Sequence, residues 1–139
     1  MKRNLSMALL VVASTSYVSS YSQKPRLNPS IGPADTRQYA NVRDAQAWRN
    51  PKLVIQADGV VVQARGIDGR KHVALVDLEQ VLASLPKESW PYGRVIMQSD
   101  QSVLPVPSDQ YRQKMGETRT AVAKLLKELD IKAELWASA

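Results

Sequence analysis

The chain has 139 residues, of which 44% are hydrophobic and 23% are charged, and its formal net charge is +6. This length supplies one compact domain, and the composition is that of a soluble globular protein, which excludes a multi-spanning membrane protein and a wholly disordered chain. The absence of Cys excludes disulfides, thiolate nucleophiles, iron–sulfur clusters and Cys-bearing zinc sites.

The basic surplus is small outside the N-terminal segment. Setting Lys2 and Arg3 aside lowers the 19 basic residues to 17, against 13 acidic residues. Acidic and basic residues alternate along most of the remaining chain, whereas nucleic-acid-binding proteins of this size usually gather Lys and Arg into one stripe. We therefore expect no nucleic-acid partner.

Residues 1–22 have the three-part organisation of a secretory signal peptide. A short basic start is followed by a mostly apolar run over 5–13 and by small hydroxyl residues over 14–22. Cleavage would leave either Tyr21 or Gln23 as the first residue, and both sites stay open. The alternative is an uncleaved membrane anchor, but a bilayer requires about 20 apolar residues. We expect cleavage, and a mature protein that is periplasmic or secreted.

Residues 23–51 carry four prolines among polar residues. Proline fixes φ and lacks an N–H group, so the stretch is predicted to be a Pro-rich polar linker. A weak helical segment over 35–48 is the alternative. It would carry Tyr39, Val42 and Trp48 and would pack on the domain.

The domain is expected to span residues 52–139. Two β-branched runs, 53–56 and 60–63, flank an Asp58-Gly59 turn and predict a β-hairpin. Residues 72–76 are predicted either to extend the chain that returns from the second strand or to form a short third strand.

Asp77 is predicted to be the N-cap of the first helix, and Val76 and Val81 have the spacing of a hydrophobic staple. An apolar face centred on Leu82 follows, and Pro86 ends the helix. Residues 94–98 then read as a buried strand.

Ser108 or Asp109 caps a second helix, which we expect to be interrupted or bent near Gly116. Its apolar face is centred on Leu125. Residues 132–137 alternate as a half-buried strand. The predicted fold class is α+β: a small two-layer sandwich with a mixed β-sheet, two helices on one face and the order β-β-(β)-α-β-α-β.

This order and several segments resemble the periplasmic domain of the ExbD/TolR family of biopolymer-transport proteins. The similarity covers the opening hairpin (53–62), the helix from Asp77, the strand with a trailing acid (95–100) and the final helix and strand (122–135). The resemblance implies a non-enzymatic subunit that dimerises in the periplasm and contacts envelope proteins or peptidoglycan.

Three features depart from the family pattern. Members carry a transmembrane Asp for proton coupling, whereas nothing before Asp35 is acidic here. The connection over residues 101–117 is longer than usual, and Asp130 stands where a Gly commonly precedes the last strand. The motor role of the family is therefore not expected.

No catalytic apparatus is recognised. His72 is the only His, no Gly-x-Ser-x-Gly elbow is present, and no phosphate-binding Gly-rich loop leads into a helix. Asp58, Asp68, Asp77 and Asp100 each have a turn, cap or strand-end role. We expect no enzyme activity, no cofactor and no metal, with a small hydrolase or inhibitor that uses a carboxylate site as the alternative.

Four residues are predicted to bind a partner: Trp90, Tyr92, Arg94 and Trp136. Aromatic rings stack on glycans or peptides, and Arg pairs with carboxylates. The competing interpretation is that the aromatic rings cover edges of the core. The expected function is that of an exported, non-enzymatic envelope interaction module whose partner is a protein or peptidoglycan, with homodimerisation left open.

Overall fold

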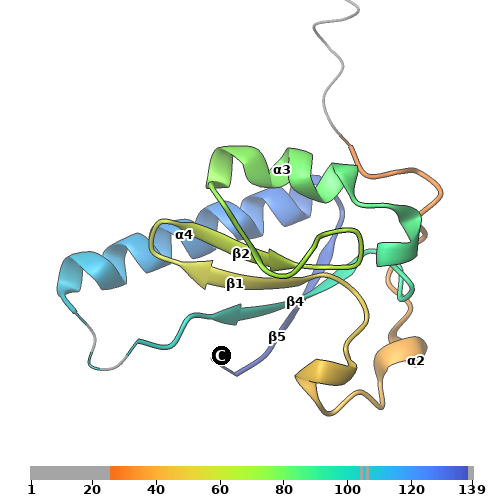
Figure 1. The fold of residues 1–139 in the computed structure, drawn as a ribbon, viewed down its shortest axis with the longest axis horizontal. Coiled ribbons are helices and arrows are strands. Elements are labelled where there is room, and N and C mark those ends of the chain that lie inside the picture. The colour runs from red at the N-terminus through yellow and green to blue at the C-terminus, as the bar shows by residue number, and fades with distance from the viewer. Residues whose placement is uncertain (1–25, 104, 106, 138–139) are drawn as a thin grey trace, which may run out of the picture.

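The computed structural model describes residues 26–103, 105 and 107–137, and the expected signal peptide lies outside them (Figure 1). A single mixed sheet has the strand order β3-β2-β1-β4-β5. Its strands are β1 (Lys52–Gln56), β2 (Gly59–Gln63), β3 (Lys71–Val73), β4 (Val95–Asp100) and β5 (Lys132–Leu135). The helices are α2 (Thr36–Tyr39), α3 (Leu75–Ser84) and α4 (Asp109–Glu128), with short 3-10 turns η1 (Ala45–Ala47) and η2 (Lys87–Ser89).

The predicted α+β fold class is confirmed. β1 and β2 form the antiparallel hairpin, β3 is the short third strand beside β2, and β4 and β5 add in parallel on the other side. Both α3 and α4 cover the same face of the sheet (Figure 1). Their apolar sides meet side chains from β1, β2 and β4, such as Ile55, Val62 and Ile96, to make the main core.

The start of α3 differs from the prediction. The helix begins at Leu75 and its N-cap is Ala74, which makes no side-chain hydrogen bond to the helix. Asp77 lies in the first turn, where its charge complements the helix dipole. Val76 is 86% exposed, so it cannot form the expected staple. Leu82 is fully buried, as predicted.

The α4 helix is continuous through Gly116 and is not interrupted there. Ser108 is its N-cap and accepts a hydrogen bond from the Tyr111 N–H at 3.1 Å. The buried face is centred on Val122 and Leu126, whereas Leu125 is only partly buried at the edge of the core. The expected apolar face exists, but its centre lies one residue away from Leu125.

Residues 26–51 belong to the folded unit, which differs from the predicted linker. Leu27 and Ile31 pack in the main core, and Tyr39 and Trp48 are buried in a second cluster on the sheet face that α3 and α4 leave uncovered. The three prolines of this segment, Pro29, Pro33 and Pro51, are compatible with this packing because they lie outside α2 and η1, in stretches without helical hydrogen bonds. We call residues 26–51 the strap.

Backbone contacts fix the strap to the start of β4. The Arg94 N–H donates to the Gly32 carbonyl and the Asp35 N–H donates to the Tyr92 carbonyl, at 3.0 and 2.9 Å. The approach is close enough that a side chain at Gly93 would overlap the backbone of Pro33, and Gly93 has a φ of 83°. Both the positive φ and the close contact require Gly at this position.

Within the described ranges, none of the helices combines the length and the hydrophobicity that a membrane span requires.

Candidate partner-binding groove

Trp90 and Tyr92 do not form an exposed surface. They are 4% and 6% exposed, Trp90 in the main core and Tyr92 in the cluster beneath the strap. For both residues the competing interpretation holds: the rings belong to the core and are not a contact surface. Neither is accessible to a partner while the strap and core stay packed.

Arg94 and Trp136 are only partly buried, and each serves the fold. The Arg94 Nε donates to the carbonyl of Ile31 at 3.1 Å, which ties the strap to the sheet. Trp136 lies at the end of β5 and packs edge-on against Trp48, with ring centroids 6.4 Å apart. The structure therefore does not bring the four predicted residues into one contact surface.

The aromatic residues gather instead between the strap and the sheet. Tyr39, Trp48 and Tyr92 have pairwise ring-centroid distances of 5.1 to 5.6 Å. Such tilted and edge-to-face pairs add to the stabilisation from burial alone. This cluster therefore forms a second, smaller hydrophobic core.

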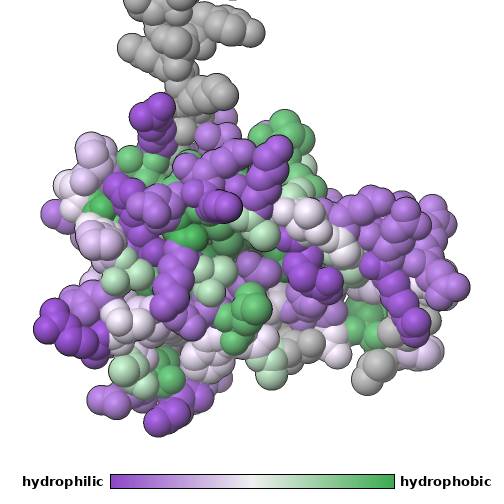
Figure 2. All heavy atoms as spheres, turned by 180° about the vertical axis from the view of Figure 1, so that it is seen from behind, coloured by the Kyte–Doolittle hydropathy of each residue, from purple (hydrophilic) through white to green (hydrophobic). Residues whose placement is uncertain are grey.

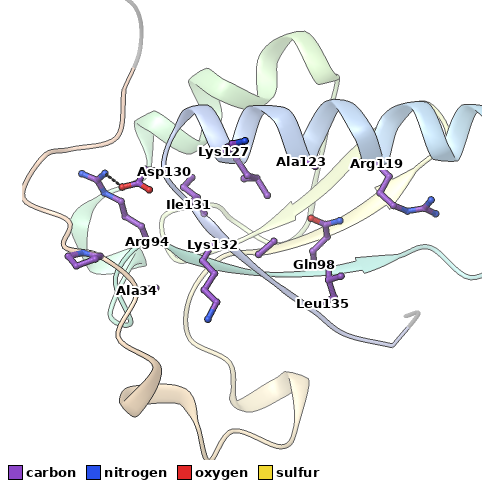
Figure 3. A pocket seen from close by; sticks show the side chains of 13 residues that line it. Ala34, Arg94, Gln98, Arg119, Ala123, Lys127, Asp130, Ile131, Lys132 and Leu135 are labelled. Atoms are coloured by element: carbon purple, nitrogen blue, oxygen red, sulfur yellow. Dashed lines mark hydrogen bonds and ion pairs between the residues drawn. The ribbon is translucent and has the colours of Figure 1, made fainter.

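A groove of about 690 Å³ runs between α4 and β5 on the outer side of the sheet edge (Figure 3). Ala123 and Leu126 line it from α4, and Ala133 and Leu135 line it from β5. Leu135 is 76% exposed, a high value for a large apolar side chain. Seen from behind, this side of the molecule shows small recessed areas of hydrophobic atoms bordered by hydrophilic side chains (Figure 2).

Basic side chains outnumber acidic ones in the lining of the groove. Arg94, Arg119 and Lys127 line the groove, with Asp130 as the single acidic lining residue. Lys132 also lines the groove, but its ammonium is paired with Glu134 on the opposite face of β5. At one end Arg94 Nη1 lies 3.5 Å from the Asp130 carboxylate, and this pair is drawn in Figure 3. Towards the other end Arg119 Nη2 lies 2.7 Å from the carboxylate of Asp100, at the end of β4.

The opposite face of β5 carries a small polar network. The Tyr39 hydroxyl donates to Glu134 Oε1 at 2.9 Å, and Lys132 Nζ lies 3.0 Å from the same oxygen. The hydrogen bond with Glu134 raises the pKa of Lys132. Burial, followed by the bond to Glu134, raises the pKa of Tyr39. The Glu134 carboxylate therefore lies on the strap side of the sheet and does not offset the positive charge of the groove.

Two of the acids singled out from the sequence, Asp58 and Asp100, lie beside basic side chains. Asp58 lies 3.5 Å from His72 Nε2, in the hairpin beside β3, and Asp100 is paired with Arg119. Within the described residues, no group of three or more His, Cys, Asp or Glu side chains is placed to hold a metal ion.

The groove was not among the features predicted from the sequence. Arg119, Ala123 and Lys127 are spaced by four residues and form a stripe beside the apolar face of α4. This spacing could have predicted, from the sequence, the side of the groove that α4 forms. The opposite wall comes from β5, and only the packing of α4 along the sheet edge brings the two together.

Searches with protein-family models, among curated proteins and among solved structures found no match to this chain.

Proposed function

We propose that this protein is an exported, non-enzymatic interaction module of the cell envelope that binds a partner in the groove between α4 and β5. The observation that carries the proposal is an apolar-lined groove with a basic rim at an open edge of the sheet. Protein-binding sites typically combine an apolar centre with a polar border and use Arg for charged contacts.

Two features support an ExbD/TolR-like role within this proposal. The element order is the one on which the resemblance rests. Asp130, at the position where the family commonly has Gly, adopts a left-handed conformation with φ of 58°. A protein or peptidoglycan partner and homodimerisation in the periplasm are the associated expectations, and the signal peptide supplies the route of export.

Photocrosslinking in intact cells tests the proposal. A photoreactive amino acid is placed at Ala123, which is exposed and lines the groove, or at Ala121, which is exposed on the same helix but lines a different hollow. We expect a discrete crosslinked product from position 123 and none from position 121. Equal products, or none from either position, would overturn the assignment of the groove.

The carboxylate-enzyme alternative is tested in the same strain. His72→Gln and Asp58→Asn remove the two partners of the hairpin pair, which lies away from the groove residues. We expect both variants to complement a deletion strain as well as the wild type does. Loss of complementation by a stably exported variant would favour an enzyme.

A further inference from the structure

We propose that the open edge of β5 takes up an extended acidic segment of a partner protein as an additional strand of the sheet. This inference rests on the proposed function, because it specifies what the groove between α4 and β5 binds. It is carried by three observations: the backbone of β5, the apolar residues beside it and the charge of the groove.

The backbone of β5 offers an unpaired hydrogen-bonding edge. β5 is the last strand on its side of the sheet, and the N–H groups of Lys132 and Trp136 donate toward β4. Alternate residues of a strand direct their backbone groups to opposite sides, so the N–H and C=O groups of Ala133 and Leu135 point away from β4. The described part of the chain places no strand there, and such an edge can pair with a strand from another chain.

The two edges of the sheet are not equivalent. β3 is three residues long, and its exposed Lys71 and His72 lie beside a hollow lined mostly by polar and small residues. β5 borders the groove, where Ala133 and the exposed Leu135 face Ala123 of α4. An added strand at β5 would bury alternate apolar side chains in the groove, which is the usual source of specificity in strand addition.

The charge of the groove selects an acidic segment. Lys127 makes no ion pair within the described residues, and Arg119 contacts Asp100 only through Nε and Nη2. Arg119 therefore keeps its Nη1 donors for another carboxylate. Both side chains come from α4 and line the groove (Figure 3).

The same charges disfavour a second copy of this chain at the edge. Pairing of two β5 strands about a twofold axis would bring Arg119 and Lys127 of each copy towards those of the other. Like charges that meet across an interface oppose association. An acidic segment of a different protein meets no such repulsion.

Fluorescence anisotropy with a synthetic peptide tests the inference. The probe is a labelled peptide of alternating Glu and Val residues, titrated with the mature protein, and its charge-reversed control replaces each Glu with Lys. Two further peptides carry backbone N-methyl groups on alternate residues, in one phase or the other. We expect the acidic peptide to bind and the basic peptide not to bind. A strand directs every second N–H to the edge with which it pairs, so only one of the two N-methylated peptides should bind more weakly than the unmethylated peptide, by about fivefold or more.

Matched variants locate the site. Lys127→Glu should weaken binding of the acidic peptide by about three- to tenfold, whereas Lys124→Glu, exposed on the same helix outside the groove, should not. Leu135→Pro removes an outward N–H without touching the bonds to β4 and should also weaken binding. Equal binding of the two charged peptides, equal effects of the two methylation phases, or equal effects of the two Lys variants would overturn strand addition. A crosslink at position 123 that persists in the presence of saturating acidic peptide would overturn this inference while leaving the proposed function in place.

Discussion

The hydroxyl of Tyr39 donates a hydrogen bond to the carboxylate of Glu134 across 95 positions of sequence, with an oxygen–oxygen distance of 2.9 Å. This bond joins the strap to β5. Tyr39→Phe removes it and keeps the aromatic packing, so we expect a loss of about 0.5–1.5 kcal/mol in the free energy of unfolding. The control is Tyr111→Phe, because the buried Tyr111 hydroxyl has no partner among the described residues. Chemical denaturation should show almost no loss for that variant, and equal losses would mean that the bond to Glu134 does not stabilise the fold.

The raised pKa of Tyr39 predicts a loss of stability at alkaline pH. Burial raises this pKa above its ordinary value of 10.0, so the folded state holds the phenol proton more tightly than the unfolded chain does. The corresponding stability is fully present below about pH 10 and declines as pH rises through the folded-state pKa. Lys132, whose pKa the bond to Glu134 raises, contributes in the same direction. Denaturation curves from pH 8 upwards should decline less steeply for Tyr39→Phe than for the wild type, and identical slopes would contradict the assignment.

Core substitutions should distinguish Leu82 from Leu125, the two leucines predicted to lie at the centres of the apolar helix faces. Leu82 is fully buried, so Leu82→Ala should cost about 2–5 kcal/mol. Leu125 is only partly buried, so Leu125→Ala should cost clearly less. Equilibrium denaturation measures both, and a larger loss at Leu125 would show that α4 packs in a different rotation.

Gly93 should tolerate no side chain. Its φ of 83° and the backbone of Pro33 both exclude a Cβ, so Gly93→Ala should cost about 1–3 kcal/mol or more and loosen the strap. Limited proteolysis within residues 26–51 would report the loosening. Gly116→Ala is the contrasting variant, because open space surrounds Gly116 inside α4, and it should gain about 0.5–1 kcal/mol.

Asn50 joins the end of the strap to the segment that leads into β4. Its side-chain amide donates to the carbonyls of Gly93 and Val95, and its oxygen accepts from the Tyr92 N–H, each at 2.8 Å. Asn50→Asp replaces the two donors with a carboxylate facing carbonyl oxygens and should cost about 1–3 kcal/mol or more. The exposed Asn41→Asp is the charge-matched control, and thermal melts that are equally lowered by both would refute the role of Asn50.

Intact-mass analysis of the exported protein checks the signal peptide. We expect a mature protein that begins at Tyr21 or Gln23 in the soluble periplasmic or secreted fraction. A full-length mass in the membrane fraction would contradict cleavage and indicate an anchor.

The sequence by itself determined the local elements of this domain. The two predicted runs formed the hairpin, although its turn residues are Ala57 and Asp58, because Gly59 is already the first residue of β2 and pairs with Gln56. Ser108 capped α4 through a bond to a residue only three positions away. These outcomes depend on turn chemistry and on hydrophobic periodicity, which are properties of neighbouring residues. The predicted cap at Asp77 and the predicted interruption at Gly116 were wrong: α3 begins at Leu75, and α4 continues through Gly116, since a single Gly costs a helix only about 1 kcal/mol.

Only the tertiary structure decided how the strap and the groove are built. The strap has few apolar residues, and their burial depends on distant segments: Leu27 and Ile31 pack in the main core, and Tyr39 and Trp48 meet residues of β4 on the other face of the sheet. The groove likewise requires α4 to lie beside β5, and no local pattern encodes that distance. Trp90 and Tyr92 entered the interior for the same reason: whether an aromatic ring is a contact surface or a core residue depends on which distant segment covers it.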